Sequence, residues 1–151
     1  TIMSTRGIAI ATLAVAGATA AALAVAARLE GMRAVQPLNA TSHWLYGAAA
    51  AKSREISARH TAVGLATHVA SSAFWAGLYG WLRGSGRPRP ALIDAAGLTV
   101  TAAVADYVVA PARVTPGWEL VVSRRSIAFA YAAMVAALVW TTPGIDGRAR
   151  R

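Results

Sequence analysis

A chain of 151 residues that is 56% hydrophobic and only 14% charged is too apolar for an ordinary soluble domain. The composition predicts one membrane domain covering residues 1–151. The absence of cysteine excludes disulfides, thiolate metal sites and haem attached through a Cys-x-x-Cys-His motif. The net charge of +9 comes mainly from arginines beside the apolar segments, which we interpret as contacts to anionic lipid headgroups rather than to nucleic acid.

Four apolar segments are candidates for crossing a bilayer, which takes about 20 residues of helix. They are predicted at residues 8–27, 61–82, 91–110 and 124–142. The fourth has the shortest apolar run, so its span must include the two arginines at its start, whose long side chains can reach the headgroups. The sequence therefore predicts an all-α, polytopic membrane protein built as a bundle of four transmembrane helices.

The first segment also has features of a secretory signal peptide, because Arg6 precedes it and Ala-Val-Ala-Ala ends it. Its apolar run of about 20 residues is longer than the usual apolar core of about 7 to 15. We therefore expect it to be retained as a spanning helix.

Residues 28–59 form the longest segment outside the predicted spans. Within it, residues 37–47 mix turn formers with Trp and Tyr, a composition typical of the membrane interface. We expect a short interfacial helix or loop here that packs on one mouth of the bundle. A second short interfacial helix is predicted after Thr115, before the fourth span.

Alanines recur every fourth residue in the first and fourth predicted spans. The stripes are Ala14, Ala18, Ala22 and Ala26, and then Ala128, Ala132 and Ala136. Small residues at this spacing let helix backbones approach closely in a membrane. We expect both stripes to face other helices of the same bundle, with a partner subunit as the alternative.

His68 lies deep in the second predicted span, where an ionisable side chain normally faces a partner, a cavity or a bound group. With four spans, the other two histidines and two acidic residues belong to the same mouth of the bundle. The candidate polar cluster or ligand site is therefore His43, His60, His68, Asp106 and Glu119, with Arg59 and Arg113 as candidate charge partners.

Three interpretations of this cluster stay open. The side chains can be interhelical contacts worth about 0.6 to 2 kcal/mol each, with Asp106 paired to Arg59, Arg113 or His60, and His68 donating to a carbonyl or a nearby hydroxyl. They can hold zinc, iron or manganese, although no H-E-x-x-H or Glu-x-x-His pair occurs. Alternatively, His68 can ligate a haem or another tetrapyrrole, with Gly64 leaving room for the flat ring. The cofactor is thus unknown.

The chain contains no sequence motif that indicates catalysis or transport. It lacks a G-x-x-x-x-G-K-S/T phosphate loop and a G-x-S-x-G elbow. Asp94 and Asp106 are about 18 Å apart along their helix and about 120° apart around it, so they do not mark a proton path. We expect Asp94 to complement the positive N-terminus of the third span instead.

Several motifs are spread over residues 36–135. They are Asn39-Ala-Thr-Ser-His43-Trp44, Arg59-His60-Thr61-Ala-Val-Gly64, Thr67-His68, Phe74-Trp75, Asp106-Tyr107 and Thr115-Pro116-Gly117-Trp118-Glu119. This set resembles an uncharacterised family of small bacterial four-helix inner-membrane proteins. The resemblance implies a multi-pass protein of the bacterial inner (cytoplasmic) membrane and brings no activity with it. The positive-inside rule favours cytoplasmic termini.

The sequence therefore favours a non-catalytic accessory or scaffold subunit of a larger bacterial membrane complex. Small size, the lack of a catalytic motif and the small-residue stripes support this hypothesis. The alternative is a membrane metalloprotein or a haem- or pigment-binding protein centred on His68. The expected partners are the lipid bilayer and other membrane-protein subunits, with no nucleic acid.

Overall fold

The computed structural model describes residues 3–85 and 89–142, and every regular element in these ranges is helical. The long helices are α1 (Thr5–Leu29), α5 (Val63–Ser85), α6 (Ala91–Val104) and α7 (Arg124–Thr141). A π-helical turn, η1 (Ala58–Ala62), leads into α5, and a second, η2 (Ala105–Val109), continues α6. The prediction of an all-α protein is confirmed.

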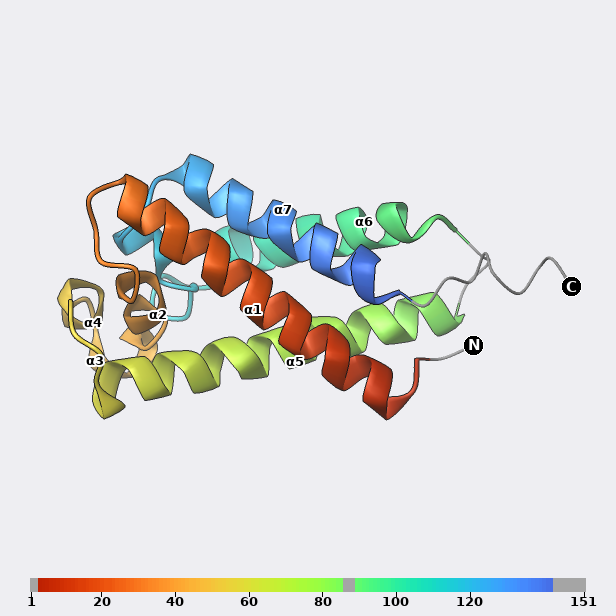
Figure 1. The fold of residues 1–151 in the computed structure, drawn as a ribbon, viewed down its shortest axis with the longest axis horizontal. Helices are drawn as coiled ribbons and strands as arrows, with labels where there is room; N and C mark the ends of the chain where they lie inside the picture. Colours follow the sequence, from red (N-terminus) through yellow and green to blue (C-terminus); the bar gives the residue numbers. More distant parts are fainter. Residues whose placement is uncertain (1–2, 86–88, 143–151) are drawn as a thin grey trace, which may run out of the picture.

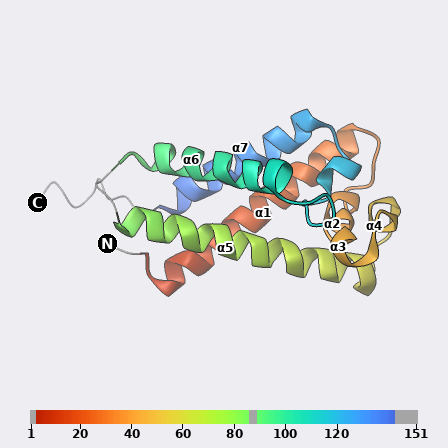
Figure 2. The same cartoon turned by 180° about the vertical axis from the view of Figure 1, so that it is seen from behind.

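The long helices alternate in direction, so each runs antiparallel to the next along the chain (Figure 1). Helix α1 packs along α5 and α7, and α6 closes the ring through contacts with the same two helices (Figure 2). The start of α1, the end of α5, the start of α6 and the end of α7 share one end of the bundle.

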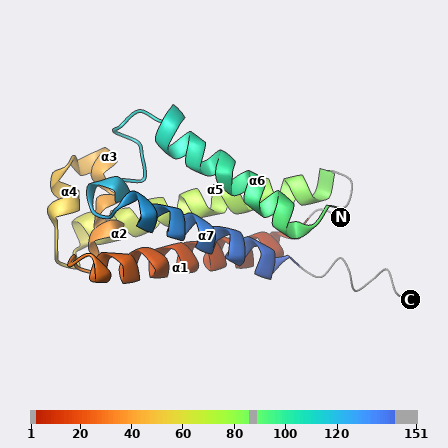
Figure 3. The ribbon, with the colours of Figure 1, turned by 90° about the horizontal axis from the view of Figure 1, so that it is seen from above.

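The opposite end carries the short elements. They are α2 (Gln36–Ala40), α3 (His43–Tyr46), α4 (Ala49–Lys52) and the 3-10 turn η3 (Trp118–Leu120). Helix α2 contacts both α1 and α5, so this cap is attached to the bundle and not loosely tethered. Toward the cap, α6 diverges from α5, as the view from above shows (Figure 3).

Large apolar side chains point outward on every long helix, while polar side chains are buried between them. Leu13, Phe74, Val100 and Phe129 are each more than half exposed. By contrast, Thr19, His68, Ser72 and Thr99 are buried. A water-soluble bundle shows the reverse distribution, with charged and polar residues on its outer face. The distribution seen here suits a bundle surrounded by lipid.

Two helical segments are long and apolar enough to cross a membrane by length and composition. They are α1 and the continuous segment Ala91–Val109, which joins α6 and η2. The core helix of a soluble protein or a signal sequence can meet the same criterion, and α5 and α7 do not meet it. The predicted topology of four spans is therefore not confirmed.

The two alanine stripes have different environments. On α1, Ala22 and Ala26 are buried, and Ala14 and Ala18 pack against the core. On α7 the stripe of Ala128, Ala132 and Ala136 is exposed. The expectation that both stripes face inward is wrong for α7, because its inward face is built from Ala130, Met134, Ala137 and their neighbours instead.

The end of α5 and the start of α6 are joined by two ion pairs, one of them buried. Asp94, which lies in the first turn of α6 as predicted, contacts the Arg83 guanidinium at 2.7 Å and that of Arg89 at 2.9 Å. The Arg83 side chain is buried as well. Removing Asp94 would leave the buried Arg83 charge without its partner, so these pairs hold the end of α5 against the start of α6.

Glu30, directly after α1, connects this helix to the N-terminus of α7. Its carboxylate accepts hydrogen bonds from the Ser126 hydroxyl, from the Ser123 hydroxyl at 2.7 Å and from the Ser123 N–H at 2.9 Å. These bonds, with that from Ser126 the strongest influence, hold the pKa of Glu30 below its ordinary value of 4.5. The carboxylate also complements the positive end of α7.

Helix α2 approaches α5 at a glycine. A Cβ atom on Gly64 would overlap the carbonyl oxygen of Leu38 in α2, so only glycine allows the two backbones to meet here. Gly117, in the left-handed region with φ of 81°, is restricted in the same way by the carbonyl oxygen of Ala40. Two glycines therefore allow the cap to sit directly on the bundle.

We expect Gly64→Ala to destabilise the fold by about 1 to 3 kcal/mol, because the added methyl group separates α2 from α5. Gly77→Ala in the same helix is the matched control, since nothing lies within 4 Å of its added Cβ. The control should be neutral or stabilising by up to about 1 kcal/mol. Thermal unfolding in detergent, followed by circular dichroism, measures both, and equal melting of the two variants would contradict the close contact.

Glu30→Gln should lower the melting temperature near neutral pH. It should also reduce the loss of melting temperature when the solution is acidified. A carboxyl group whose pKa is lowered by folding stabilises the fold above its unfolded pKa, and this contribution is lost as the pH falls through the lowered value. The parent should therefore lose stability below about pH 4.5, and the variant should lose less. Glu55→Gln, at an exposed position, is the control. An identical acid response in all three proteins would refute the role of Glu30.

Candidate functional site

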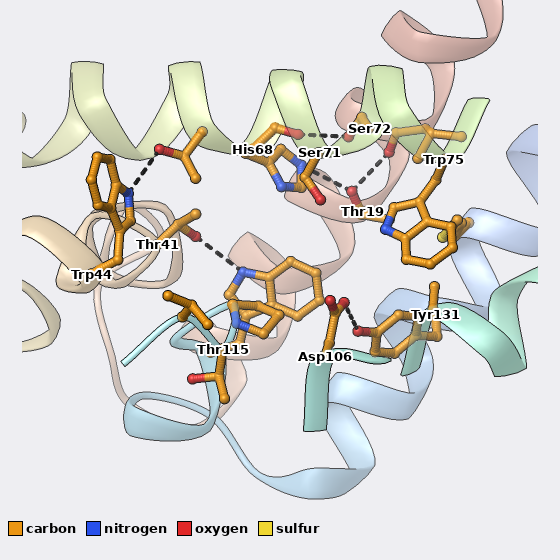
Figure 4. Close-up of a pocket in the computed structure, with 17 residues that line it drawn as sticks. Thr19, Thr41, Trp44, His68, Ser71, Ser72, Trp75, Asp106, Thr115 and Tyr131 are labelled. Atoms are coloured by element: carbon orange, nitrogen blue, oxygen red, sulfur yellow. Dashed lines mark hydrogen bonds between the residues drawn. The ribbon is translucent and has the colours of Figure 1, made fainter. Parts of the chain in front are cut away.

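A cavity of about 220 Å³ lies between α5 and α6 at the end of the bundle that carries the cap (Figure 4). It is lined by side chains from all four long helices, from η2 and from the cap. Two residues of the predicted cluster, His68 and Asp106, line this cavity.

His68 connects α5 to α1 through one ring nitrogen. Its Nε2 lies 3.0 Å from the carbonyl oxygen of Ala16 and 3.0 Å from the hydroxyl of Thr19. The Thr19 hydroxyl donates its own proton to Val15 at 2.7 Å, so we assign the proton of the ring to Nε2, which donates to both oxygens. In this neutral tautomer Nδ1 is an acceptor, and no described residue hydrogen bonds to it.

Asp106 approaches the cavity from the π-helical turn η2. One of its oxygens accepts a hydrogen bond of 2.6 Å from the Tyr131 hydroxyl of α7. Among the described residues it forms no ion pair. The candidate charge partners are elsewhere: Arg59 lies over the ring of Tyr46, 4.7 Å from its centroid, and Arg113 is exposed. Asp106 therefore brings an uncompensated carboxyl group to the cavity.

His43 joins the cap to the loop after α6. Its Nδ1 lies 3.0 Å from the carbonyl oxygen of Ala40, and its Nε2 lies 3.1 Å from that of Ala112. The Thr115 hydroxyl, which lines the cavity, donates to the Glu119 carboxylate. His43 and Glu119 thus hold segments that surround the cavity, and neither residue lines it.

His60 is separate from both groups. Its Nδ1 is 3.4 Å from the Ser42 hydroxyl, and its ring meets the ring of Tyr46 edge to face. The structure therefore brings His68 and Asp106 to one cavity, places His43 and Glu119 beside it, and leaves His60 in η1, against the cap.

The metal and tetrapyrrole hypotheses gain no support from this arrangement. No group of three His, Asp or Glu side chains within the described ranges is placed to hold a metal ion. The Nε2 of His68 is bonded to α1, and the space beside Gly64 is filled by the Leu38 backbone instead of being open to a flat ring. The residues present therefore do not fit a tetrapyrrole that is ligated by the Nε2 of His68 and lies beside Gly64.

Two residues that hold the site were missed by sequence reasoning. Thr19 binds His68 and Tyr131 binds Asp106, yet neither was among the candidates. A signal was present, because each is a hydrogen-bonding side chain deep in a predicted apolar span. Trp118, which follows Thr115 in the second predicted interfacial helix, is buried between the rings of His68 and Tyr131.

Comparison with protein-family models, curated proteins and solved structures finds no match to this chain. The resemblance to a bacterial four-helix family therefore stays a prediction. No activity, cofactor or partner is carried over from a relative.

The contact between His68 and Thr19 should be measurable as a coupling energy. In a double-mutant cycle of His68→Ala and Thr19→Val, we expect the two changes to be non-additive by about 0.6 kcal/mol or more. Thr12→Val is the matched control, because Thr12 lies on α1 and its hydroxyl donates within that helix, to Ile8. Unfolding in detergent gives the energies, and full additivity for both threonines would show that the bond contributes nothing.

Proposed function

We propose that this chain is a four-span protein of a bacterial inner membrane that works by binding rather than by catalysis, and that the cavity lined by His68 and Asp106 is its binding site. The observation that carries the proposal is a partly polar cavity inside a bundle whose outer face is apolar. Polar side chains in such surroundings are costly unless they have partners or a function.

The four-span topology is supported by the charge pattern of the two helices that do not meet the apolar criterion. Residues 61–82 and 126–142 contain no Asp, Glu, Lys or Arg. Helix α5 lowers its mean hydropathy through His68, Ser71 and Ser72, which all line the cavity; His68 and Ser72 are buried, and Ser71 is exposed. Both segments also contain Trp and Tyr, whose rings suit the membrane interface.

The hydrogen bonds at the cavity favour binding over chemistry. A nucleophilic hydroxyl needs a base that takes its proton. Here the Thr19 hydroxyl gives its proton to Val15, while His68 donates to Thr19. Tyr131 likewise donates to Asp106. In the pair of His68 and Thr19 the histidine is therefore a donor and not the base that would activate the hydroxyl, and these bonds together make a preorganised polar lining.

An accessory or scaffold role within a larger membrane complex is part of this proposal. The exposed stripe of Ala128, Ala132 and Ala136 on α7 supports it, because small residues let the backbone of another helix approach closely. With the chain ends in the cytoplasm, as charge favours, the cavity would lie toward the outer half of the bilayer.

The proposal is tested with a substitution that places a larger side chain in the cavity. Ser71 lines it, and its side chain forms no hydrogen bond within the described residues, so Ser71→Phe adds volume there without breaking a bond of the fold. Ala73→Phe is the matched control, since Ala73 is exposed on the same helix and does not line the cavity. Both variants and the parent are purified in mild detergent from native membranes.

Mass spectrometry of small molecules and proteins in each preparation gives the result. We expect a molecule or subunit that accompanies the parent and Ala73→Phe, and a loss of about tenfold or more with Ser71→Phe, since a phenyl ring occupies much of the cavity. Equal recovery of everything in the three preparations, with all three folded, would refute the cavity as the site of function.

A further inference from the structure

The cavity combines one carboxyl group with aromatic rings. Asp106, Tyr131 and three tryptophans, Trp44, Trp75 and Trp118, are among the residues that line it. None of the described lining residues is Lys or Arg, although the chain carries a net charge of +9. An anionic ligand would meet Asp106 and find no Lys or Arg, and the Nε2 proton of His68 is already donated to α1, so the lining favours a cation.

Asp106 differs from Asp94, the other acidic residue of the same helical segment. Asp94 is neutralised by Arg83 and Arg89. Asp106 has only the Tyr131 hydroxyl, on one of its two oxygens. It lies in a π-helical turn, a distortion that often marks functional sites in helices. The Asp106 carboxylate can therefore act as the counter-ion of a positively charged ligand.

The aromatic walls are held in place before any ligand binds. The Trp118 indole donates to the Thr41 hydroxyl at 3.2 Å and lies between the rings of His68 and Tyr131, with centroids 6.0 and 5.8 Å away. The Trp44 indole donates to Thr67 at 3.1 Å. Rings that are already ordered lose little entropy when a ligand binds.

Trp75 completes the site from the opposite wall. In the close-up, Trp75 on α5 lies across the cavity from Asp106 on η2 (Figure 4). The faces of indole rings attract cations, above all alkylated ammonium groups, which keep an apolar surface around their charge. A bare metal ion would need several oxygen ligands, and the cavity supplies one carboxyl group.

We propose that this cavity binds an organic ammonium group, with Asp106 as its counter-ion and the tryptophan rings as its walls. The inference rests on the proposed function, because it names the ligand class of the same cavity. The ammonium group belongs either to a lipid headgroup or to a free amine with a small apolar body, and both present the same chemistry to Asp106.

The probe is benzyltrimethylammonium, and the matched neutral probe is neopentylbenzene, in which carbon replaces the charged nitrogen. Each is titrated into the full chain in nanodiscs of phosphatidylglycerol, a lipid without an amine, with empty nanodiscs as the blank. Tryptophan fluorescence and calorimetry report binding. We expect saturable binding of the cation and weaker binding, by about tenfold or more, of the neutral probe.

Variants test whether the Asp106 charge and the Trp75 ring contribute to binding of the cation. Asp106→Asn keeps an acceptor for Tyr131 and removes the charge, so the Kd of the cation should rise about tenfold or more. Glu55→Gln removes an exposed charge that does not line the cavity and should leave the Kd unchanged. Trp75→Leu should weaken binding about threefold or more, and Trp75→Phe less than that. Thermal unfolding confirms that each variant is folded.

A second lipid distinguishes the two possible ligands, a lipid headgroup and a free amine. If phosphatidylcholine headgroups enter the cavity, the apparent Kd of the probe rises in phosphatidylcholine nanodiscs. An unchanged Kd assigns the site to a free amine. Either result supports the ammonium site.

Equal affinity for the charged and neutral probes in the parent would overturn the inference, as would an Asp106→Asn variant that is folded and binds the cation normally. The proposed function would then still stand if Ser71→Phe loses the molecule that accompanies the parent, with a neutral ligand in place of an ammonium. Failure of both experiments would refute the site as a whole.

Discussion

The carbonyl oxygen of Leu38 rests against Gly64, and the arrangement of the functional end depends on this contact. It fixes α2 on α5, and Asn39 secures the cap from there by donating to the backbone of Ser53 and Glu55, each at 3.0 Å, and accepting from Thr61 at 2.6 Å. A fully buried amide must have such partners. The cap is therefore a rigid part of the bundle and a firm wall for the cavity.

Gly117, the second glycine, positions the loop on the far side of the cavity. Gly117 lets the loop after α6 approach Ala40, and His43 contacts both Ala40 and Ala112. The loop then carries Trp118 into the bundle, where its indole meets Thr41 of the cap. Because α6 diverges from α5 toward this end, the two helices do not fill the space between them, and the cap and the loop line the half-open cavity that remains.

The distribution of polar groups explains why this space suits a ligand. Most buried hydroxyls donate within their own helix, as Thr19 and Ser72 do to the carbonyls four residues earlier. Such bonds satisfy a side chain without help from water, which a bilayer does not supply. Asp106 is different, since its carboxyl group has a tyrosine for a partner where Asp94 has two arginines. A protein that only needed stability would gain nothing from that difference.

The amino-acid sequence by itself determined the helical class and the approximate position of each long helix, because apolar runs and their polar boundaries are local properties. It also indicated that His68 and Asp106 belong to one end of the bundle, since alternating helices alone require it. It could not pair His68 with Thr19 or Asp106 with Tyr131, because each pair joins different helices and depends on how they are rotated. Only the tertiary structure decided that the α7 alanines face outward, that Gly64 receives a backbone and not a flat ligand, and that a cavity separates α5 from α6. Each of these outcomes depends on side chains distant in sequence meeting in three dimensions, which no local pattern encodes.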